Sequence, residues 1–286
     1  MKGIVLAGGT GSRLWPITRS VSKQLLPVYD KPMIYYPIST LMLAGIREIL
    51  IITTPHDQSQ FIELLGDGSE IGVSFVYATQ PEPKGLAQAF TIGEEFLAGD
   101  SSLMILGDNI FHGAGLGRDI VRDLPKSGAH IFTYEVANPN DYGILEVSQE
   151  GVPVSITEKP TEFISNLAVT GVYFFDGKVA EVAKNVKPSK RGELEITSVL
   201  DHYLKFGSLS FTRLSRGSAW LDTGNPDSLS DAAAYVKIIE DRTGLKIGCL
   251  EEIAFLNGWI GRLEIESLVK KYGKSQYGLY LKRLVL

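Results

Sequence analysis

The order of apolar and polar positions predicts strands alternating with helices over the first 128 residues. Apolar runs of strand length lie at residues 2–7, 49–53, 73–77 and 103–106. Amphipathic stretches of helix length lie between them at residues 32–44, 57–65 and 86–97. This alternation is typical of βαβ units and a parallel sheet. Because such crossovers are right-handed, the loops that follow the strands should share one sheet edge, where ligands of open α/β sheets bind.

The pattern changes from residue 129, where strand-like runs follow one another through short connections. These runs lie at residues 130–136, 143–147, 154–158, 170–175 and 209–214, with helical stretches at 179–185 and 195–206. After residue 225 the pattern is mostly helical, including a charged amphipathic stretch at 263–272. We therefore expect an α/β fold with a Rossmann-like, mixed and largely parallel sheet flanked by helices. The core would span residues 1–225, and residues 226–286 would form a helical C-terminal extension for packing or oligomer contacts.

Composition and charge exclude several classes of protein. The 286 residues carry a net charge of −5, which argues against broad binding of nucleic acid or an anionic membrane. Cys249 is the only cysteine, so neither an intrachain disulfide nor a thiolate metal cluster can form. The apolar runs are shorter than the ~18 residues that span a bilayer, and the N-terminal run stops at glycine, unlike a signal peptide. We expect a soluble, cytoplasmic protein.

A glycine-rich turn directly follows the first strand. Its residues are Gly8, Gly9, Thr10, Gly11, Ser12 and Arg13. Glycines let main-chain N–H groups face an anion, although Leu14 replaces the third glycine of a dinucleotide fingerprint and no Walker A ending is present. Lys23 adds a second cation near Arg13, a combination that suits a polyphosphate. The alternative is a tight turn with a solvent-exposed arginine and lysine.

Two aspartates follow strand-like runs and are candidate metal ligands. Asp108 comes after residues 103–106, and Asp222 comes after a run near residue 220. Two carboxylates with phosphate oxygens and water suit Mg²⁺, whereas the alternative is that each aspartate caps a turn. The sequence does not show that positions 108 and 222 meet. The four histidines have no metal-ligand spacing.

Two further polar segments are candidates for substrate contacts. Glu158 and Lys159 precede Pro160, which favours an extended backbone at Lys159, and the alternative is a plain surface loop. Gln80 lies shortly before Gly85 and the start of a predicted helix. Its amide could read the imide edge of thymine or uracil, and the alternative is a loop glutamine without a role.

The chain resembles the sugar-1-phosphate nucleotidylyltransferases along essentially its whole length. Residues 3–37, GIVLAGGTGSRLWPITRSVSKQLLPVYDKPMIYYP, are similar to the opening signature of that family, and residues 23–27 resemble its thymidylyl branch. Further similar segments are LMLAGIREILII, LLGDGSEIGVSF, QPEPKGLAQAF, LGDNIFHG, ITEKP, RGELEITSVL and AWLDTGNPDSL.

The resemblance implies a reaction. A thymidylyl group would pass from dTTP to α-D-glucose 1-phosphate, giving dTDP-glucose and pyrophosphate, with Mg²⁺ as cofactor. This reaction would be the first step of dTDP-L-rhamnose and deoxysugar synthesis for cell-surface polysaccharide. It also implies a homotetramer inhibited by a downstream deoxysugar nucleotide at an interface. The alternatives are a uridylyltransferase, another sugar-1-phosphate nucleotidylyltransferase, or a non-catalytic regulatory subunit of the same fold.

The resemblance also implies residue roles. Residues 1–128 would hold the nucleotide and 129–225 the sugar phosphate. The catalytic residues would be Arg13, Lys23 and Lys159. The nucleotide would contact the glycine-rich turn (Gly8, Gly9, Thr10, Gly11, Ser12, Arg13) with Gln24, Gln80 and Gly85. The sugar phosphate would contact Asp108, Asn109, Gly143, Glu158, Lys159 and Val169, and the metal would bind Asp108 and Asp222.

Overall fold

The computed structural model describes residues 1–189 and 192–286. In the N-terminal part, strands β1 to β7 lie at Lys2–Ala7, Pro27–Val28, Lys31–Pro32, Glu48–Thr53, Ser74–Thr79, Ser102–Leu106 and Asn109–His112. Helices α1 to α5 lie at Tyr35–Leu43, Gln58–Leu65, Gln88–Ile92, Glu94–Leu97 and Leu116–Arg122. Strands β8 to β13 then lie at Ala129–Glu135, Gly143–Val147, Pro153–Glu158, Leu167–Phe175, Leu209–Arg213 and Ala219–Asp222. Helices α6 to α11 lie at Val179–Lys184, Ile196–Lys205, Pro226–Thr243, Leu250–Leu256, Arg262–Tyr272 and Gln276–Arg283.

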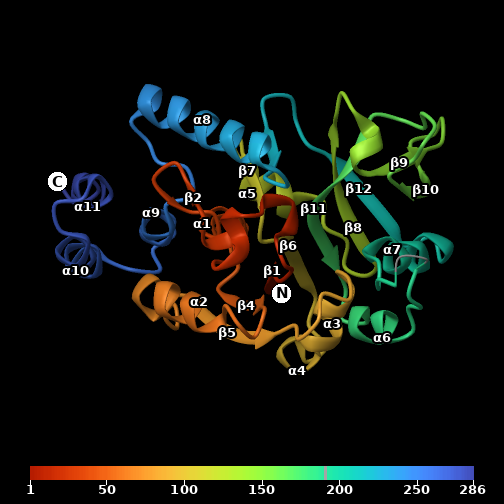
Figure 1. The fold of residues 1–286 in the computed structure, drawn as a ribbon, viewed down its shortest axis with the longest axis horizontal. Coiled ribbons are helices and arrows are strands. Elements are labelled where there is room, and N and C mark those ends of the chain that lie inside the picture. Colours follow the sequence, from red (N-terminus) through yellow and green to blue (C-terminus); the bar gives the residue numbers. More distant parts are fainter. Residues whose placement is uncertain (190–191) are drawn as a thin grey trace.

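One mixed sheet forms the centre of the molecule (Figure 1). Its path runs β10-β9-β11-β6-β1-β4-β5, and β8 and β12 extend it from β11. The β6-β1-β4-β5 part is parallel, as the βαβ pattern predicts, whereas β11 runs antiparallel to β6, β8 and β9. The mixed sheet flanked by helices confirms the predicted fold class.

Strand β11 is where the sheet forks. On one side its neighbour is β9 at Ala168 and β6 from Val172 onward. On the other side the register against β8 shifts between Val169 and Tyr173. Because a crevice opens where a strand changes neighbours, ligands bind at such points in open sheets.

The two faces of the sheet carry separate apolar clusters. Alternation along β1 places Val5 in one cluster and Ile4 and Leu6 in the other. The first cluster is covered by α1, α2, α5 and the C-terminal helices α9 to α11, and the second by α3, α6 and α7. Helices α9 to α11 therefore gather at one end of the molecule, and β9, β10 and α7 lie at the other (Figure 1).

Several elements differ from the sequence prediction. The helix expected at 86–97 is two short helices, because the backbone leaves helical geometry at Gly93. Helix α1 begins at Tyr35 because β3 occupies Lys31–Pro32. Helix α5 and strand β7 were not predicted.

The C-terminal part is helical, as expected from residue 226. Helix α8 begins there with a capping box at Asn225, and three shorter helices follow. Within residues 1–189 and 192–286, no helix has both the length and the apolar character needed to cross a membrane. The RGELEITSVL motif begins at residue 191, which lies outside the described residues.

Candidate active site

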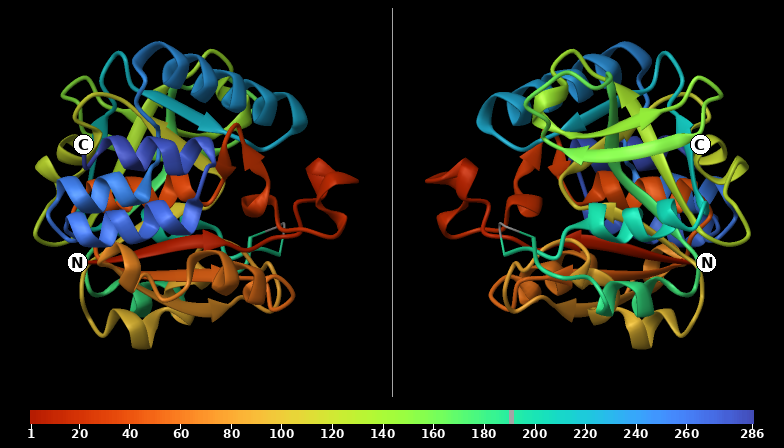
Figure 2. Two further views of the ribbon diagram at one scale, coloured as in Figure 1. Left: turned by 90° about the vertical axis from the view of Figure 1, so that its left-hand side faces the viewer. Right: turned by 90° about the vertical axis from the view of Figure 1, so that its right-hand side faces the viewer.

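A cleft of about 520 Å³ opens at the sheet fork and the C-terminal edge of β1 and β6. Every residue to which the sequence gave a role in binding or catalysis lines it. The structure therefore brings all of these residues together, from the turn after β1 to β13, although their individual roles stay predictions. The segment that carries the glycine-rich turn extends from the body of the molecule (Figure 2).

The turn after β1 has a backbone that needs glycine. Gly11 has a φ of 59°, in the left-handed region, and its carbonyl accepts a hydrogen bond of 2.7 Å from the Thr18 hydroxyl. A short 3₁₀ turn at Ser12–Leu14 follows, with Leu14 buried and Arg13 exposed. Burial of Leu14 thus fixes the turn while the Arg13 guanidinium faces the cleft.

Gln80 lies against the glycine-rich turn, but its amide is already engaged by the protein. Its Nε2 donates to the Gly85 carbonyl at 3.1 Å and to Oε1 of Gln88 at 2.8 Å, and its side chain is buried. A Cβ at position 8 would lie 2.5 Å from Oε1 of Gln80, so the amide oxygen packs on Gly8. The structure therefore gives Gln80 a role in shaping this end of the cleft, and base reading by its amide stays a prediction.

Gly85 permits a close approach between two loops. A Cβ at position 85 would lie 2.4 Å from the Leu194 carbonyl oxygen. The Leu194 N–H donates to the Lys84 carbonyl at 2.6 Å, and its carbonyl accepts from the Ala87 N–H at 3.0 Å. The loop after β5 and the loop before α7 are thus joined at the cleft, which the sequence did not predict.

The two candidate metal carboxylates meet across a small antiparallel ribbon. Asp222, the last residue of β13, pairs with Asn109 at the start of β7. The Thr223 hydroxyl donates to the Asp108 carbonyl at 2.8 Å, which ties the two segments together. Lys23 Nζ lies 2.6 Å from Oδ2 of Asp108, and the lysine side chain is only 8% exposed.

The surroundings shift the pKa values of the two carboxyls in opposite directions. For Asp108, burial raises the pKa, but the Lys23 charge and hydrogen bonds from Lys23 and Asn109 outweigh burial and lower it. For Asp222, burial and the negative charge of Asp108 raise the pKa, and Lys23, Arg13 and Lys159 only partly offset them. The cleft therefore holds a pair of repelling carboxyl groups in partly dry surroundings.

This pair fits a hard divalent cation. Mg²⁺ prefers oxygen ligands and is commonly held by one or two carboxylates together with substrate phosphates and water. Among residues 1–189 and 192–286, no cluster of three or more acidic, histidine or cysteine side chains forms a complete metal cage. Asp108 and Asp222 would thus hold the ion jointly with the substrate.

Asn109 is placed to orient Asp108. Its Nδ2 donates to Oδ1 of Asp108 at 2.9 Å, and its Oδ1 accepts from Nε1 of Trp220 at 2.6 Å. A Cβ at Gly171 would lie 2.5 Å from Oδ1 of Asn109, so only glycine allows β11 to approach this amide. Asn109 is 3% exposed. The amide therefore links Trp220 to the carboxylate.

Lys159 lies on the other wall of the cleft with a backbone unlike the one expected. Its φ is 46°, whereas the following proline predicted an extended conformation, and that prediction is wrong. Strand β10 ends at Glu158, and the Lys159 N–H donates to the Tyr142 carbonyl at 2.9 Å. This hydrogen bond holds the turn, and strained backbone of this kind often accompanies functional sites.

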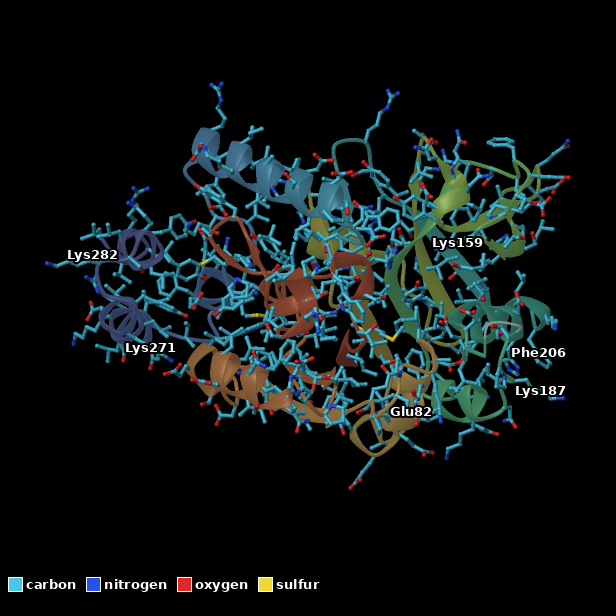
Figure 3. The ribbon with its side chains drawn as sticks, in the orientation of Figure 1. Glu82, Lys159, Lys187, Phe206, Lys271 and Lys282 are labelled. Carbon is cyan, nitrogen blue, oxygen red and sulfur yellow. The ribbon has the colours of Figure 1, made fainter. Side chains whose placement is uncertain are left out.

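The sugar-phosphate candidates gather on the same wall. Gly143 pairs with Glu158 across β9 and β10, and the buried Val169 lies in β11. Lys159 lies in the half of the molecule built from β8 to β12, at the opposite end from Lys271 and Lys282 of the C-terminal helices (Figure 3).

The sequence missed several aromatic and polar residues of the cleft. Tyr142 packs on Trp220 with ring centroids 5.1 Å apart, and both line the cavity. Burial, then the charges of Glu158, Asp108 and Asp222, raise the pKa of Tyr173, so its hydroxyl stays protonated. The other missed lining residues are Leu6, Leu14, Pro83, Leu86, Leu106, Asp141, Thr170, Gly171, Glu193, Glu195 and Ile196. Some of these residues lie in strands, and the others lie in loops, in 3₁₀ turns or at the start of α7, where no spacing in the sequence marks a side chain that lines a cleft.

Comparison with known proteins agrees with this fold. The family model described as nucleotidyl transferase matches residues 2–237. The chain belongs to the nucleotidyl transferase family, as the sequence predicts, and is a nucleotidyltransferase.

Two of its relatives carry the same name. The chain is 54% identical to glucose-1-phosphate thymidylyltransferase of Neisseria meningitidis, over 100% of this chain and 99% of the relative. It is 55% identical to the Xanthomonas campestris protein of the same name, over 99% and 96%.

Solved structures show the same fold. A putative glucose-1-phosphate thymidylyltransferase from Bacillus anthracis, in complex with sucrose, matches with a TM-score of 0.76 at 42% identity, over 82% of this chain and 94% of that one. A UDP-glucose pyrophosphorylase complexed with UDP-glucose matches with a TM-score of 0.72 at 25% identity, over 83% and 98%.

Proposed function

We propose that this nucleotidyltransferase transfers a thymidylyl group from dTTP to α-D-glucose 1-phosphate, releasing pyrophosphate. One observation carries the proposal: a glycine-rich turn with Arg13 faces Asp108, Asp222 and Lys23 within a single cleft. This combination suits a nucleoside triphosphate opposite a second phosphate. The choice of thymidylyl and glucosyl groups is supported by the name of the relatives at 54% and 55% identity.

The chemistry needs positioning and charge neutralisation more than proton transfer. An oxygen of the sugar phosphate is already ionised at neutral pH and attacks the α-phosphorus of dTTP in line with the departing pyrophosphate. Arg13 and the N–H groups of residues 8–12 bind the β- and γ-phosphates. Lys159 holds the attacking phosphate, and Lys23 lies between it and the nucleotide.

Mg²⁺ is proposed as the cofactor, held by Asp108 and Asp222. When bound, it supplies positive charge to the oxygens of the triphosphate. The Lys23 ammonium and the Asn109 amide keep the Asp108 carboxylate ionised and fixed in direction. Asp222 gains most from a cation, because its pKa is raised by burial and by Asp108.

The two ends of the cleft bind the two substrates. Gln24, Gln80 and Gly85 contact the nucleotide, and burial of both glutamines makes the pocket around the base rigid. Asn109, Gly143, Glu158 and Val169 surround the sugar. Residues 1–128 thus serve mainly the nucleotide and 129–225 the sugar phosphate, with 226–286 as a packing and assembly extension.

The proposal also covers the use of the product, the cellular compartment and the oligomeric state. The product would be dTDP-glucose for dTDP-L-rhamnose or other deoxysugars of cell-surface polysaccharide, and the enzyme would work in the cytoplasm as a homotetramer. A non-catalytic subunit of this fold is disfavoured, because Arg13, Lys23, Asp108 and Asp222 are all present and line one cleft.

A panel assay tests the substrates and the metal together. Pyrophosphate release is measured with dTTP, UTP, ATP, CTP and GTP against several hexose 1-phosphates, with Mg²⁺ and with a chelator. We expect the highest kcat/KM for dTTP with glucose 1-phosphate, and turnover near background when the metal is removed. Preference for UTP would replace the thymidylyl assignment with the uridylyl alternative, and no turnover with any pair would overturn the enzymatic proposal.

A further inference from the structure

The hydroxyl of Ser22 holds the side chain of Gln24. Both residues are buried, but Gln24 lines the cleft and Ser22 does not. Oγ of Ser22 donates a hydrogen bond of 2.8 Å to Oε1 of Gln24. A serine at the N-cap of a helix commonly accepts a hydrogen bond from a backbone N–H, but Ser22, at the N-cap of the 3₁₀ turn Lys23–Leu25, makes no such bond. Its hydroxyl therefore acts on the glutamine instead of on the turn.

The amide nitrogen of Gln24 opens onto the cleft. Among the described residues, none accepts a hydrogen bond from Nε2 of Gln24. The unpaired side-chain atoms that are sealed from solvent in the same part of the chain are the hydroxyl oxygens of Ser102, Thr133 and Thr170. Nε2 is therefore unpaired but not sealed, and the space that it reaches is the cavity that Gln24 lines. Its N–H groups are available to a ligand.

The rest of Gln24 is fixed by contacts other than Ser22. Its carbonyl accepts a hydrogen bond of 2.9 Å from the Ile34 N–H. A Cβ at position 107 would lie 3.0 Å from Cγ of Gln24, so the stem of the side chain packs on Gly107. The orientation of the amide is then set by Ser22, because the reverse orientation would bury the Ser22 O–H and a second amide N–H without acceptors among the described residues.

We propose that Ser22 is a positioning residue, which orients the Gln24 amide so that Nε2 donates to an acceptor oxygen of the nucleotide. The proposal rests on the proposed function, because it takes Gln24 as a nucleotide contact. The acceptor would belong to the nucleoside or to the triphosphate, since both carry such oxygens. Without the Ser22 hydroxyl, the same orientation leaves Oε1 of Gln24 buried and unpaired, so the amide moves and binding has to restore its position.

The test measures nucleotide binding to Ser22→Ala, which removes the hydroxyl and adds no bulk. Binding of dTTP is followed by isothermal titration calorimetry with Mg²⁺ and without a sugar phosphate, so that no transfer occurs. We expect the Kd for dTTP to rise about 3- to 10-fold, as for the loss of a single hydrogen bond. In steady-state kinetics, the KM for glucose 1-phosphate should change less than the KM for dTTP.

Two comparisons separate positioning from a merely structural role. Ser39→Ala removes another buried hydroxyl, which donates to the Tyr36 carbonyl at 2.6 Å and does not line the cleft, so the Kd for dTTP should stay unchanged. Ser22→Ala combined with Gln24→Met should bind dTTP no more weakly than Gln24→Met alone, because the amide that Ser22 orients is already absent. Thermal denaturation checks that each variant is folded at the temperature of the titration.

Thymidine distinguishes the two sources of the acceptor oxygen. If Ser22→Ala weakens thymidine and dTTP by the same factor, the role of Ser22 is supported and the acceptor lies on the nucleoside. If it weakens dTTP alone, the role is equally supported and the acceptor lies on the triphosphate.

The outcomes also distinguish this proposal from the proposed function. An unchanged Kd for dTTP in Ser22→Ala, or a further loss in the double variant, would overturn the role of Ser22 while wild-type turnover upholds the reaction. If the wild type preferred UTP, the reaction would be revised and the same titrations with UTP would decide the role of Ser22. If the wild type bound and used no nucleotide, both proposals would fail.

Discussion

Neighbouring charges shift the pKa values of Asp108 and Asp222 in opposite directions, although the two side chains are chemically identical. Asp108 is paired with Lys23 and hydrogen-bonded by Asn109, which lowers its pKa despite burial. Among residues 1–189 and 192–286, Asp222 forms no such ion pair, and burial together with the Asp108 charge raises its pKa. An ionised Asp222 is therefore an unfavourable charge that a bound cation and substrate would offset.

Asp222→Asn should therefore lose activity without losing stability. The amide removes a proposed metal ligand, and loss of one preorganised electrostatic partner lowers kcat by about 10²–10³-fold. Because the folded-state pKa of Asp222 is raised, its proton is favoured by folding and its charge at neutral pH opposes folding. The variant should thus have an equal or higher Tm, measured by thermal denaturation beside steady-state kinetics.

Asp201→Asn is the matched control for that prediction. Burial raises the pKa of Asp201 also, but this residue lies on α7 and does not line the cleft. Its variant should keep normal kcat. Normal kcat in Asp222→Asn itself would remove Asp222 from the metal site.

The elements around the cleft are joined by a buried group of four charged side chains. Lys31 of β3 and Lys246 each pair with Asp30 and with Glu240 near the end of α8. The Lys31 side chain is 2% exposed and that of Glu240 is 6% exposed. Helix α8 starts just after Asp222, so this charged group fastens its far end to the β2–β3 hairpin that follows Lys23.

Lys31→Met should strongly destabilise the protein. Without Lys31, the Asp30 and Glu240 carboxylates share Lys246 alone, so one negative charge is uncompensated, and breaking a buried ion pair in this way costs about 3–5 kcal/mol in unfolding free energy. The exposed Lys184–Glu94 pair, with side chains 52% and 50% exposed, provides the comparison, and Lys184→Met should cost less than about 1 kcal/mol. Urea denaturation measures both values, and similar losses in the two variants would contradict the role given to the buried group.

Stability of the whole molecule should depend on pH through His130. The ring is 2% exposed between β8 and β12, where its nitrogens lie 2.7 Å from the Ser210 hydroxyl and 2.9 Å from the Thr212 hydroxyl. Burial lowers the pKa of His130 to about 4, with a small opposing effect of Asp123. The unfolded chain therefore binds this proton more readily than the folded protein does.

The sign of the effect follows from that difference. Below the unfolded pKa of about 6.5, protonation favours unfolding, so stability falls as pH decreases from about 6.5 towards 4. His130→Gln removes this contribution. The unfolding free energy of wild type minus variant should shrink by up to about 3 kcal/mol between pH 7 and pH 4. The exposed His202→Gln serves as control, and parallel pH curves for wild type and His130→Gln would disprove the assignment.

The order of apolar and polar residues along the chain was enough to predict much of the architecture. Residues 2–7, 49–53 and 103–106 lie within strands β1, β4 and β6, because short apolar runs bounded by polar turns have few other stable arrangements in a buried sheet. The break at Gly93 and the β7–β13 ribbon were not predicted. Both depend on contacts with residues far along the chain, which leave no local period.

The sequence by itself determined the class of fold, the family, and a set of charged and glycine residues that all line one cleft. These features follow from local patterns, such as glycines after a strand and carboxylates at strand ends. Only the tertiary structure decided that Asp108 and Asp222 meet and that Lys159 has a positive φ. The physical reason is that charge pairing, burial and strand branching depend on neighbours in space, which the order of residues does not specify.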